Sequence, residues 1–368
     1  MVQLTLRLLP VGRGDCALIR FPDDSWAVVD CGQKRGSYEP YTQAATFLNN
    51  ESPPDTPIRF VLATHPHADH DGGILQLMEQ LGQRRIHSVF FCGIERRSSV
   101  SSSNQVFDDG EYSFVQEANR RVRAKQLGEC KKLEAPATIK LTPPIDGLGI
   151  NVVWPTPTAV SRAKKIKITH LKGTTVNNLS VALKIDYGTN SVLLLGDLQG
   201  KIYARVLDRA LEGTPIRVIK APHHGGENSI ISWDSISSVS NSPGFILISC
   251  PTGSYKHPHA DFLKPIPMGK WIIRCTGLAG GCIGQQPAEL WPVRPAESSL
   301  PKSLQRSLLS IGSRYRFPHF EQNAECNINI VVTLDANGGL AHSSSSRFCD
   351  TSRDFSEEQT PSLSADDL

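Results

Sequence analysis

The feature that most constrains this chain is a cluster of three histidines and an aspartate within residues 65–70. A short apolar run, Phe60–Ala63, precedes the cluster and predicts a buried strand. Apolar residues recur at positions 74, 77, 78 and 81, just before Gly82, which predicts an amphipathic helix with a glycine C-cap. The cluster is therefore expected on a loop between a strand end and a helix start.

The side chains of this cluster suit a divalent metal. Imidazole and carboxylate groups are ligands for borderline ions such as zinc, which makes His65, His67, Asp69 and His70 candidate ligands. An ion with three protein ligands keeps one position open for water. The alternative interpretation is a histidine-rich surface loop that binds nothing.

Composition limits the classes of protein to which this chain can belong. The chain has 368 residues, a net charge of +3 and nine cysteines without a Cys-x-x-Cys pair. Scattered cysteines predict reduced thiols, and this charge is too small to indicate a nucleic-acid partner by itself. A strand-like segment begins at Val2, and no apolar run approaches the roughly 18–20 residues that span a bilayer. We therefore expect a cytoplasmic protein without a signal peptide or membrane span.

Both halves of the sequence direct acidic or histidine residues to the ends of predicted strands. In the first half, a predicted hairpin of residues 16–21 and 26–30 ends at Asp30, which is either a turn former or a support for a ligating histidine. In the second half, a hairpin of residues 179–185 and 191–195 leads to Asp197, and a strand over 216–220 leads to His223 and His224. This pattern suggests two face-to-face sheets with helices outside and one site at a shared edge.

A set of motifs spread over residues 1–280 resembles the metallo-β-lactamase superfamily, and within it the ComEC-type competence hydrolase domain. The segments that carry the resemblance are Val11–Asp15, Val29–Gly32, His65–His70, Asn177–Ser180, Leu195–Asp197, Lys220–Gly225 and His257–His259. The resemblance implies an αββα four-layer sandwich, of class α/β, with one or two metal ions. The membrane channel of full-length competence proteins has no counterpart in this sequence.

The resemblance also implies a role for each matching residue. His65 and His67 would hold the first ion, Asp69 and His70 the second, and Asp197 would bridge the two. His223 would complete the second site, with His224 as the alternative, and Asp30 would support the ligands. Asp69 is also expected to be essential for catalysis.

One position departs from the pattern of the superfamily. A further first-site histidine is expected upstream of the bridging aspartate, but Asn178 occupies the corresponding position. An amide oxygen is a poor ligand for a soft metal, so zinc or manganese are both candidates and full occupancy of the first site is an open question. His170 is a more distant candidate replacement.

The expected activity is metal-dependent hydrolysis through an activated water, for which two ions suit phosphodiesters and other esters. The ComEC-like resemblance favours DNA or RNA as the substrate. The basic residues Arg162, Lys164, Lys165 and Lys167 could contact phosphates or could be ordinary solvated surface. His257 could contact the scissile phosphate or protonate the leaving group, or it could only cap a turn before Pro258. The remaining alternatives are a lactone or thioester hydrolase and a metal-binding regulatory module without turnover.

Three regions are predicted along the chain. Residues 1–284 are expected to form the hydrolase domain, and residues 285–341 a C-terminal extension with an added strand over 327–334. The serine, acidic and proline content of residues 342–368 predicts a disordered tail.

Overall fold

The structure is a computed structural model that describes residues 3–11, 14–34, 39–82, 84–94, 113–165, 173–229, 244–249, 257–259, 262, 271–276, 330–337 and 339–344. Lys167, His170, residues 95–112 and most of the predicted C-terminal extension and tail lie outside the described residues. Within the described residues, no helix is both long and apolar enough to cross a membrane.

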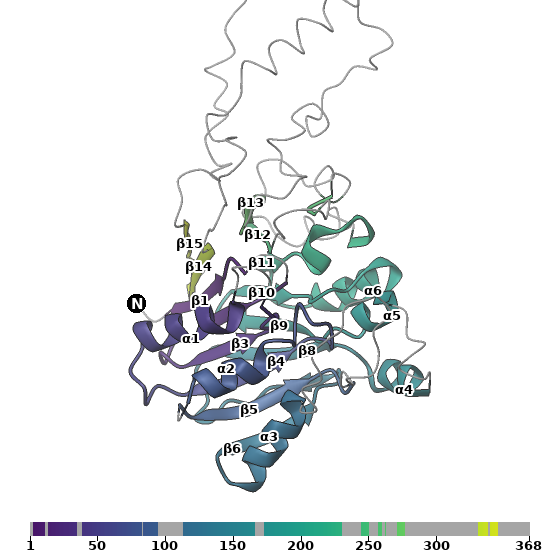
Figure 1. Ribbon diagram of the computed structural model, residues 1–368. Coiled ribbons are helices and arrows are strands. Elements are labelled where there is room, and N and C mark those ends of the chain that lie inside the picture. Colours follow the sequence, from purple (N-terminus) through teal and green to yellow (C-terminus); the bar gives the residue numbers. More distant parts are fainter. Residues whose placement is uncertain are drawn as a thin grey trace, which may run out of the picture.

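Two mixed β-sheets form the centre of the molecule (Figure 1). The first sheet has the strand order β15-β14-β1-β2-β3-β4-β5-β6 and the second has the order β13-β12-β11-β10-β9-β8-β7. The strands of the first sheet are β1 (Gln3–Leu8), β2 (Ala17–Arg20), β3 (Trp26–Val29), β4 (Ile58–Ala63), β5 (Ile86–Phe91), β6 (Leu127–Lys132), β14 (Ile330–Asp335) and β15 (Leu340–Ser344). Those of the second are β7 (Ala137–Thr138), β8 (Leu148–Trp154), β9 (Ala182–Tyr187), β10 (Asn190–Leu194), β11 (Ile216–Lys220), β12 (Gly244–Ile248) and β13 (Trp271–Cys275).

The apolar side chains of these strands build three packed layers. One buried cluster, which includes Leu6, Phe60, Leu183 and Val218, fills the space between the two sheets. A second cluster joins the outer face of the first sheet to α1 (Pro40–Glu51), α2 (Ile74–Gln80) and α3 (Phe114–Arg123). A third joins the outer face of the second sheet to α6 (Gly200–Ala210). These layers confirm the predicted αββα sandwich.

The remaining helices whose bounds fall within the described residues are short. They are α4 (Pro157–Lys165), α5 (Gly173–Asn177) and the 3₁₀ turns η2 (Pro222–Gly225) and η3 (Glu227–Ser229). The structure confirms the predicted hairpins, β2–β3 and β9–β10, and the predicted helix α2.

Helices α1 and α3 are two examples of a difference from the sequence prediction. Helix α1 was not predicted, because its buried face consists mainly of Ala44, Ala45 and Leu48, and small alanines give a weak apolar signal. The spacing of Phe114, Ala118 and Val122 predicts a helix over residues 111–127, but helix α3 ends at Arg123. Leu127 instead pairs with Ile86 in the parallel β5–β6 ladder, so tertiary pairing overrides the local helical pattern.

The C-terminal segment is an integral part of the first sheet. Strand β14 pairs with β1 over six residues, and β15 pairs with the other side of β14. Strand β15 extends to Ser344, so the tail predicted to begin at residue 342 starts inside this strand. Leu334 and Val332 of β14 are fully buried and contribute to the core between the sheets.

Strand direction determines where the functional side chains meet. β3 and β4 are parallel in the first sheet, and β10, β11 and β12 are parallel in the second. The carboxyl ends of parallel strands lie at one edge of a sheet, and loops that follow them are a common position for ligand sites. The predicted site residues follow β3, β4, β10 and β11 at this edge.

Candidate metal centre

Three loops, from both sheets, bring histidines and carboxylates together. One group consists of His65, His70 and Asp197, and a second of Asp69, His70 and His224. In each group the candidate ligand atoms lie within 4.8 Å of one another. The two groups share His70 and come from the loops after β4, β10 and β11. The histidine cluster is thus part of a buried site, and the alternative of an isolated surface loop is wrong.

Asp197 lies between the two groups with one carboxylate oxygen toward each. Its Oδ1 is 3.2 Å from His70 Nε2 and 3.9 Å from His224 Nε2. Its Oδ2 is 3.8 Å from His65 Nε2 and 4.0 Å from His223 Nε2. A carboxylate with imidazole nitrogens around each oxygen is the arrangement expected of a bridging ligand.

The hydrogen bonding of these side chains tests whether the site fits metal ions. His70 Nε2, His224 Nε2 and Asp197 Oδ1 are buried, and none has a hydrogen-bond partner among the described residues. Buried polar atoms are normally paired, so three unpaired atoms that converge need an explanation. A divalent cation bound by nitrogen and oxygen ligands satisfies all three.

Asp30 fixes the orientation of ligands from both groups. Its Oδ2 lies 2.8 Å from His70 Nδ1 and accepts a hydrogen bond of 2.8 Å from Thr64 Oγ1. The same threonine hydroxyl is 3.1 Å from His65 Nδ1. One carboxylate therefore holds the Nδ1 sides of two histidines, which leaves their Nε2 atoms for a metal.

A buried ion pair supports the second group from the other side. Lys220 donates to Asp15 Oδ2, and both side chains are about 5% exposed or less. The Asp15 carboxylate lies 3.6 Å from His70 Nδ1 and 3.5 Å from His224 Nδ1. His224 Nδ1 also lies 3.0 Å from the Ser249 carbonyl oxygen. Polar groups of Lys220 at the end of β11, Ser249 after β12 and Asp15 in the loop before β2 thus surround the Nδ1 atoms of His70 and His224.

Gly14 lets the loop before β2 closely approach the loop of residues 64–73 after β4, which we call the metal loop. A Cβ atom at Gly14 would lie 2.2 Å from the carbonyl oxygen of Asp69, and its φ of +119° is one that only glycine adopts readily. The same carbonyl accepts a hydrogen bond from the Asp15 amide at 3.0 Å. The glycine therefore places Asp15 and Asp69 side by side.

Burial and neighbouring charge shift the pKa values at the site. Burial would raise the pKa of Asp197, but the neighbouring imidazoles of His70 and His224 hold it well below its usual range. Burial would lower the pKa of His70, but Asp197 and Asp30 raise it well above its usual range. Burial, together with His224 and His223, lowers the pKa of His257 to about 4. The His257 imidazole is therefore neutral at pH 7.

The structure brings most of the predicted residues together. His67 lies beside His65, with 3.1 Å between His67 Nδ1 and His65 Nε2. The His257 ring lies 5.4 Å from that of His223. Of the two adjacent histidines, His224 lies in the group with Asp69 and His70, whereas His223 Nε2 lies 4.0 Å from Asp197 Oδ2.

Other predicted residues lie outside the cluster. The side-chain oxygen of Asn178 accepts a hydrogen bond of 2.9 Å from the Gln199 amide, so it caps the loop before α6. Arg162, Lys164 and Lys165 are exposed on α4.

Sequence reasoning missed Asp15, Lys220 and Ser180 as functional supports. Ser180 Oγ accepts a hydrogen bond of 2.9 Å from the Asp197 amide and lies 3.2 Å from His65 Nδ1. All three residues occur in the motifs that carried the resemblance, but their side chains were not assigned. A charged residue at the end of an apolar strand, such as Lys220 after Ile219, was the signal that could have identified one of them.

The sequence profile of the metallo-beta-lactamase superfamily matches residues 9–234, which is more than half of the chain. The chain therefore belongs to the metallo-beta-lactamase superfamily, whose members are mostly metal-dependent hydrolases that bind divalent metals, often two. The ComEC-type subgroup stays a prediction.

Individual relatives are distant or match only in part. The uncharacterized protein YcaI of Escherichia coli (strain K12) is 38% identical over 53 residues, which are 14% of this chain and 7% of YcaI. The metallo-beta-lactamase fold protein YhfI from Bacillus subtilis is 12% identical over 74% of this chain and 96% of YhfI, with a TM-score of 0.41. CmlA, a diiron beta-hydroxylase from Streptomyces venezuelae, is 14% identical over 72% of this chain and 46% of CmlA, with a TM-score of 0.34.

Proposed function

We propose that this protein is a metal-dependent phosphodiesterase that hydrolyses DNA or RNA. The observation that carries the proposal is the position of Asp197, whose two oxygens face separate sets of imidazole nitrogens. Two ions held on such a carboxylate supply an activated water and stabilise negative charge on the attacking and leaving oxygens. Phosphodiester hydrolysis needs both of these contributions.

The residues of the chain divide between binding the ions and positioning the substrate. His65, His67, Asp69, His70, Asp197 and the histidine pair after β11 would supply the ligand atoms. His257, beside His223 at the rim, is the candidate to contact the scissile phosphate. Its neutral imidazole can donate a hydrogen bond to a phosphate oxygen.

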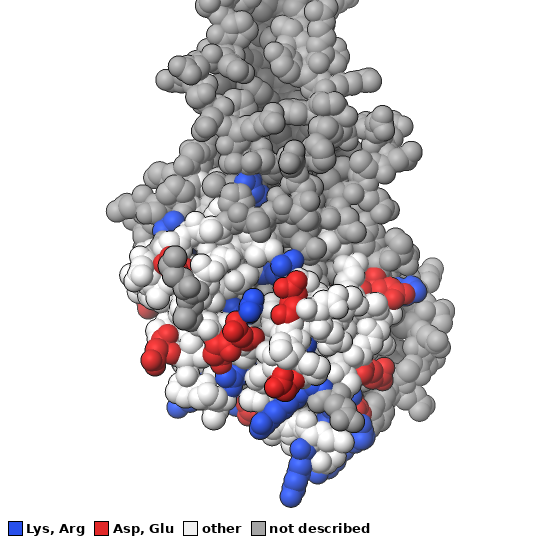
Figure 2. Space-filling model, turned by 90° about the vertical axis from the view of Figure 1, so that its left-hand side faces the viewer, with Lys and Arg blue, Asp and Glu red and all other residues white. Residues whose placement is uncertain are grey.

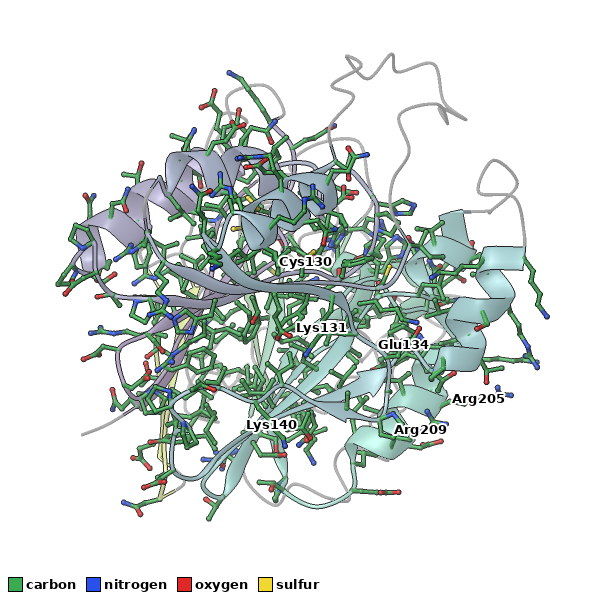
Figure 3. The ribbon with its side chains drawn as sticks, turned by 90° about the horizontal axis from the view of Figure 1, so that it is seen from below. Cys130, Lys131, Glu134, Lys140, Arg205 and Arg209 are labelled. Atoms are coloured by element: carbon green, nitrogen blue, oxygen red, sulfur yellow. The ribbon has the colours of Figure 1, made fainter. Side chains whose placement is uncertain are left out.

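Exposed basic side chains on two helices support a polyanionic substrate. Helix α4 exposes Arg162, Lys164 and Lys165, and α6, which starts three residues after Asp197, exposes Arg205 and Arg209 (Figure 3). Helices α6, α5 and α4 follow one another down the right of Figure 1. The left-hand face carries lysine, arginine, aspartate and glutamate side by side (Figure 2). Lysine and arginine contacts with phosphates would release counterions and make binding depend on salt.

The test is binding and cleavage of single- and double-stranded DNA and RNA across a salt series, with zinc or manganese supplied. Changing Arg162, Lys164, Lys165 and Lys167 together to glutamine should weaken binding. The salt slope for duplex DNA should fall by about one unit for each phosphate that these side chains neutralise in the wild type. Metal content should stay unchanged in this variant.

A matched control removes four positive charges from the opposite edge of the first sheet. Arg20 ends β2, Arg85 precedes β5, and Arg123 and Lys125 precede β6, so all four lie away from the site. Glutamine at these positions should leave the salt slope at the wild-type value. Equal slopes for both fourfold variants would show that α4 is ordinary surface. A wild-type protein that cleaves a lactone or thioester and no nucleic acid would refute the phosphodiesterase proposal.

A further inference from the structure

Two consecutive histidines end the loop after β11 with an unusual backbone. His223 and His224 both have a left-handed conformation, with φ values of 45° and 54°. Non-glycine residues adopt this region rarely, and such residues cluster at functional sites. The His223 amide donates to the Gly196 carbonyl at 3.0 Å, which attaches this turn to the loop that carries Asp197. The turn directs the two rings apart, with 6.2 Å between their centroids.

The two rings approach different oxygens of Asp197. His224 Nε2 lies 3.9 Å from Oδ1, the oxygen that His70 Nε2 approaches to 3.2 Å. His223 Nε2 lies 4.0 Å from Oδ2, the oxygen that His65 Nε2 approaches to 3.8 Å. Each histidine of the pair therefore shares its carboxylate oxygen with a histidine from the metal loop.

The surroundings of the two histidines also differ. The His224 side chain is 5% exposed, and its Nδ1 faces the Ser249 carbonyl. The His223 side chain is 26% exposed, and its buried Nδ1 has no hydrogen-bond partner among the described residues. Gly226 leaves room for this ring, because a Cβ there would lie 3.0 Å from His223 Nδ1.

Asn178 does not supply the ligand that the first group lacks. Its side-chain oxygen accepts the Gln199 amide, and its main-chain oxygen accepts a hydrogen bond of 2.7 Å from Trp154 Nε1. Both oxygens thus hold neighbouring segments in place. If His70, which both groups share, serves the second ion, the first ion is left with His65, the neighbouring His67 and one oxygen of Asp197. These are three ligands, against four for the second ion: Asp69, His70, His224 and the other oxygen of Asp197.

We propose that the histidine pair is divided between the two ions, so that His223 is a ligand of the ion bound by His65 and His67, while His224 is a ligand of the ion bound by Asp69 and His70. The proposal rests on the two-ion centre of the proposed function. It explains how a chain with asparagine at position 178 completes its first site: the nitrogen ligand comes from the loop after β11.

Metal stoichiometry in single and double variants tests this division. Asparagine replaces each histidine, because asparagine tolerates the left-handed backbone and is a poor ligand for zinc. His67→Asn serves as the reference for the first ion, since His67 is only partly buried. Each purified protein is loaded with zinc, passed through a desalting column and analysed for zinc by mass spectrometry.

The double variants His67→Asn/His223→Asn and His223→Asn/His224→Asn give opposite results under the two assignments. We expect two zinc ions in the wild type, one in His223→Asn and one in His224→Asn. His67→Asn/His223→Asn should keep one ion, because both changes damage the same site, and His67→Asn/His224→Asn should keep none. The reverse result, with no ion in His67→Asn/His223→Asn and one in His223→Asn/His224→Asn, would overturn the division. A wild type that holds a single ion, or a His223→Asn protein that keeps two, would overturn it as well.

Two controls separate this proposal from folding effects and from the proposed function. Far-ultraviolet circular dichroism of the metal-free proteins shows whether each variant is folded. If a double variant is unfolded, the Co²⁺ absorption spectra of the single variants decide, because His223→Asn must then alter the same spectral component as His67→Asn. Asn178→Ala should keep two ions. Two ions in the wild type without cleavage of nucleic acid would refute the phosphodiesterase activity and leave the division intact.

Discussion

The buried ion pair between Lys220 and Asp15 allows a quantitative prediction. Lys220 is 4% exposed and Asp15 is 3% exposed, so neither charge is solvated by bulk water. Burial would lower the pKa of Lys220, but Asp15 and Asp197 raise it, which keeps the ammonium charged. Changing Lys220 to methionine keeps a long flexible side chain and leaves the Asp15 carboxylate buried without its cation.

Removing one partner of a buried pair costs about 3–5 kcal/mol. We expect a loss near the lower end, about 3 kcal/mol, because ring nitrogens of His224 and His70 remain 3.5 and 3.6 Å from the Asp15 carboxylate. The double variant Asp15→Asn/Lys220→Met removes both charges and should recover most of that loss, since a buried pair adds little net stability over neutral groups.

The assay is urea unfolding of metal-free protein in the presence of a chelator, so that metal binding does not add to the measured stability. The free energies of unfolding of the wild type, both single variants and the double variant form a double-mutant cycle. A loss below about 1 kcal/mol for Lys220→Met would show that the charge of Asp15 is not buried in the way the geometry indicates. A double variant as unstable as the sum of the single variants would show that the two side chains do not interact.

Three further predictions concern the supports of the site and the helix layer. Asp30→Asn should weaken metal binding by about 10–100-fold, because the residue that orients His70 directly and His65 through Thr64 loses its charge. Competition with a chromophoric chelator measures the metal affinity. An unchanged affinity would contradict this role of Asp30. Gly14→Ala should lower the free energy of unfolding by more than Gly82→Ala, for which we expect a loss of roughly 1–2 kcal/mol. Both glycines have a positive φ, but only at Gly14 would the added Cβ lie 2.2 Å from a backbone oxygen, that of Asp69. Equal losses in chemical unfolding would refute the close approach. Glu117→Gln should reduce stability at pH 7, because hydrogen bonds from Arg120 and Arg121, opposed by burial, lower the pKa of Glu117 to about 2 from 4.5. That stabilisation is present above the unfolded-state pKa and is lost as the pH falls toward 2, so the melting temperatures of wild type and variant should converge over this range, and a constant difference would contradict the assignment.

Several elements could be predicted from the sequence because their signals are local. The hairpins β2–β3 and β9–β10 and the helix α2 follow from apolar periodicity and turn residues that lie within a few positions. The spacing of His65, His67, Asp69 and His70 on one loop after a buried strand predicted a metal site for the same reason. Helix α1 was missed because its buried alanines give little contrast with the polar face.

The sequence by itself determined which chemical groups are available and that strand ends present them: the histidine loop after β4, Asp197 after β10 and the histidine pair after β11. Only the tertiary structure decided how these groups are arranged around the candidate metal centre. The left-handed turn at His223 and His224, the capping bond that occupies Asn178, and the ion pair of Asp15 and Lys220 depend on contacts between both sheets. Lys220 and Asp15 are 205 positions apart in sequence. Local patterns carry no information about such a pairing, because it exists only once the strand ends of the two sheets meet at one edge.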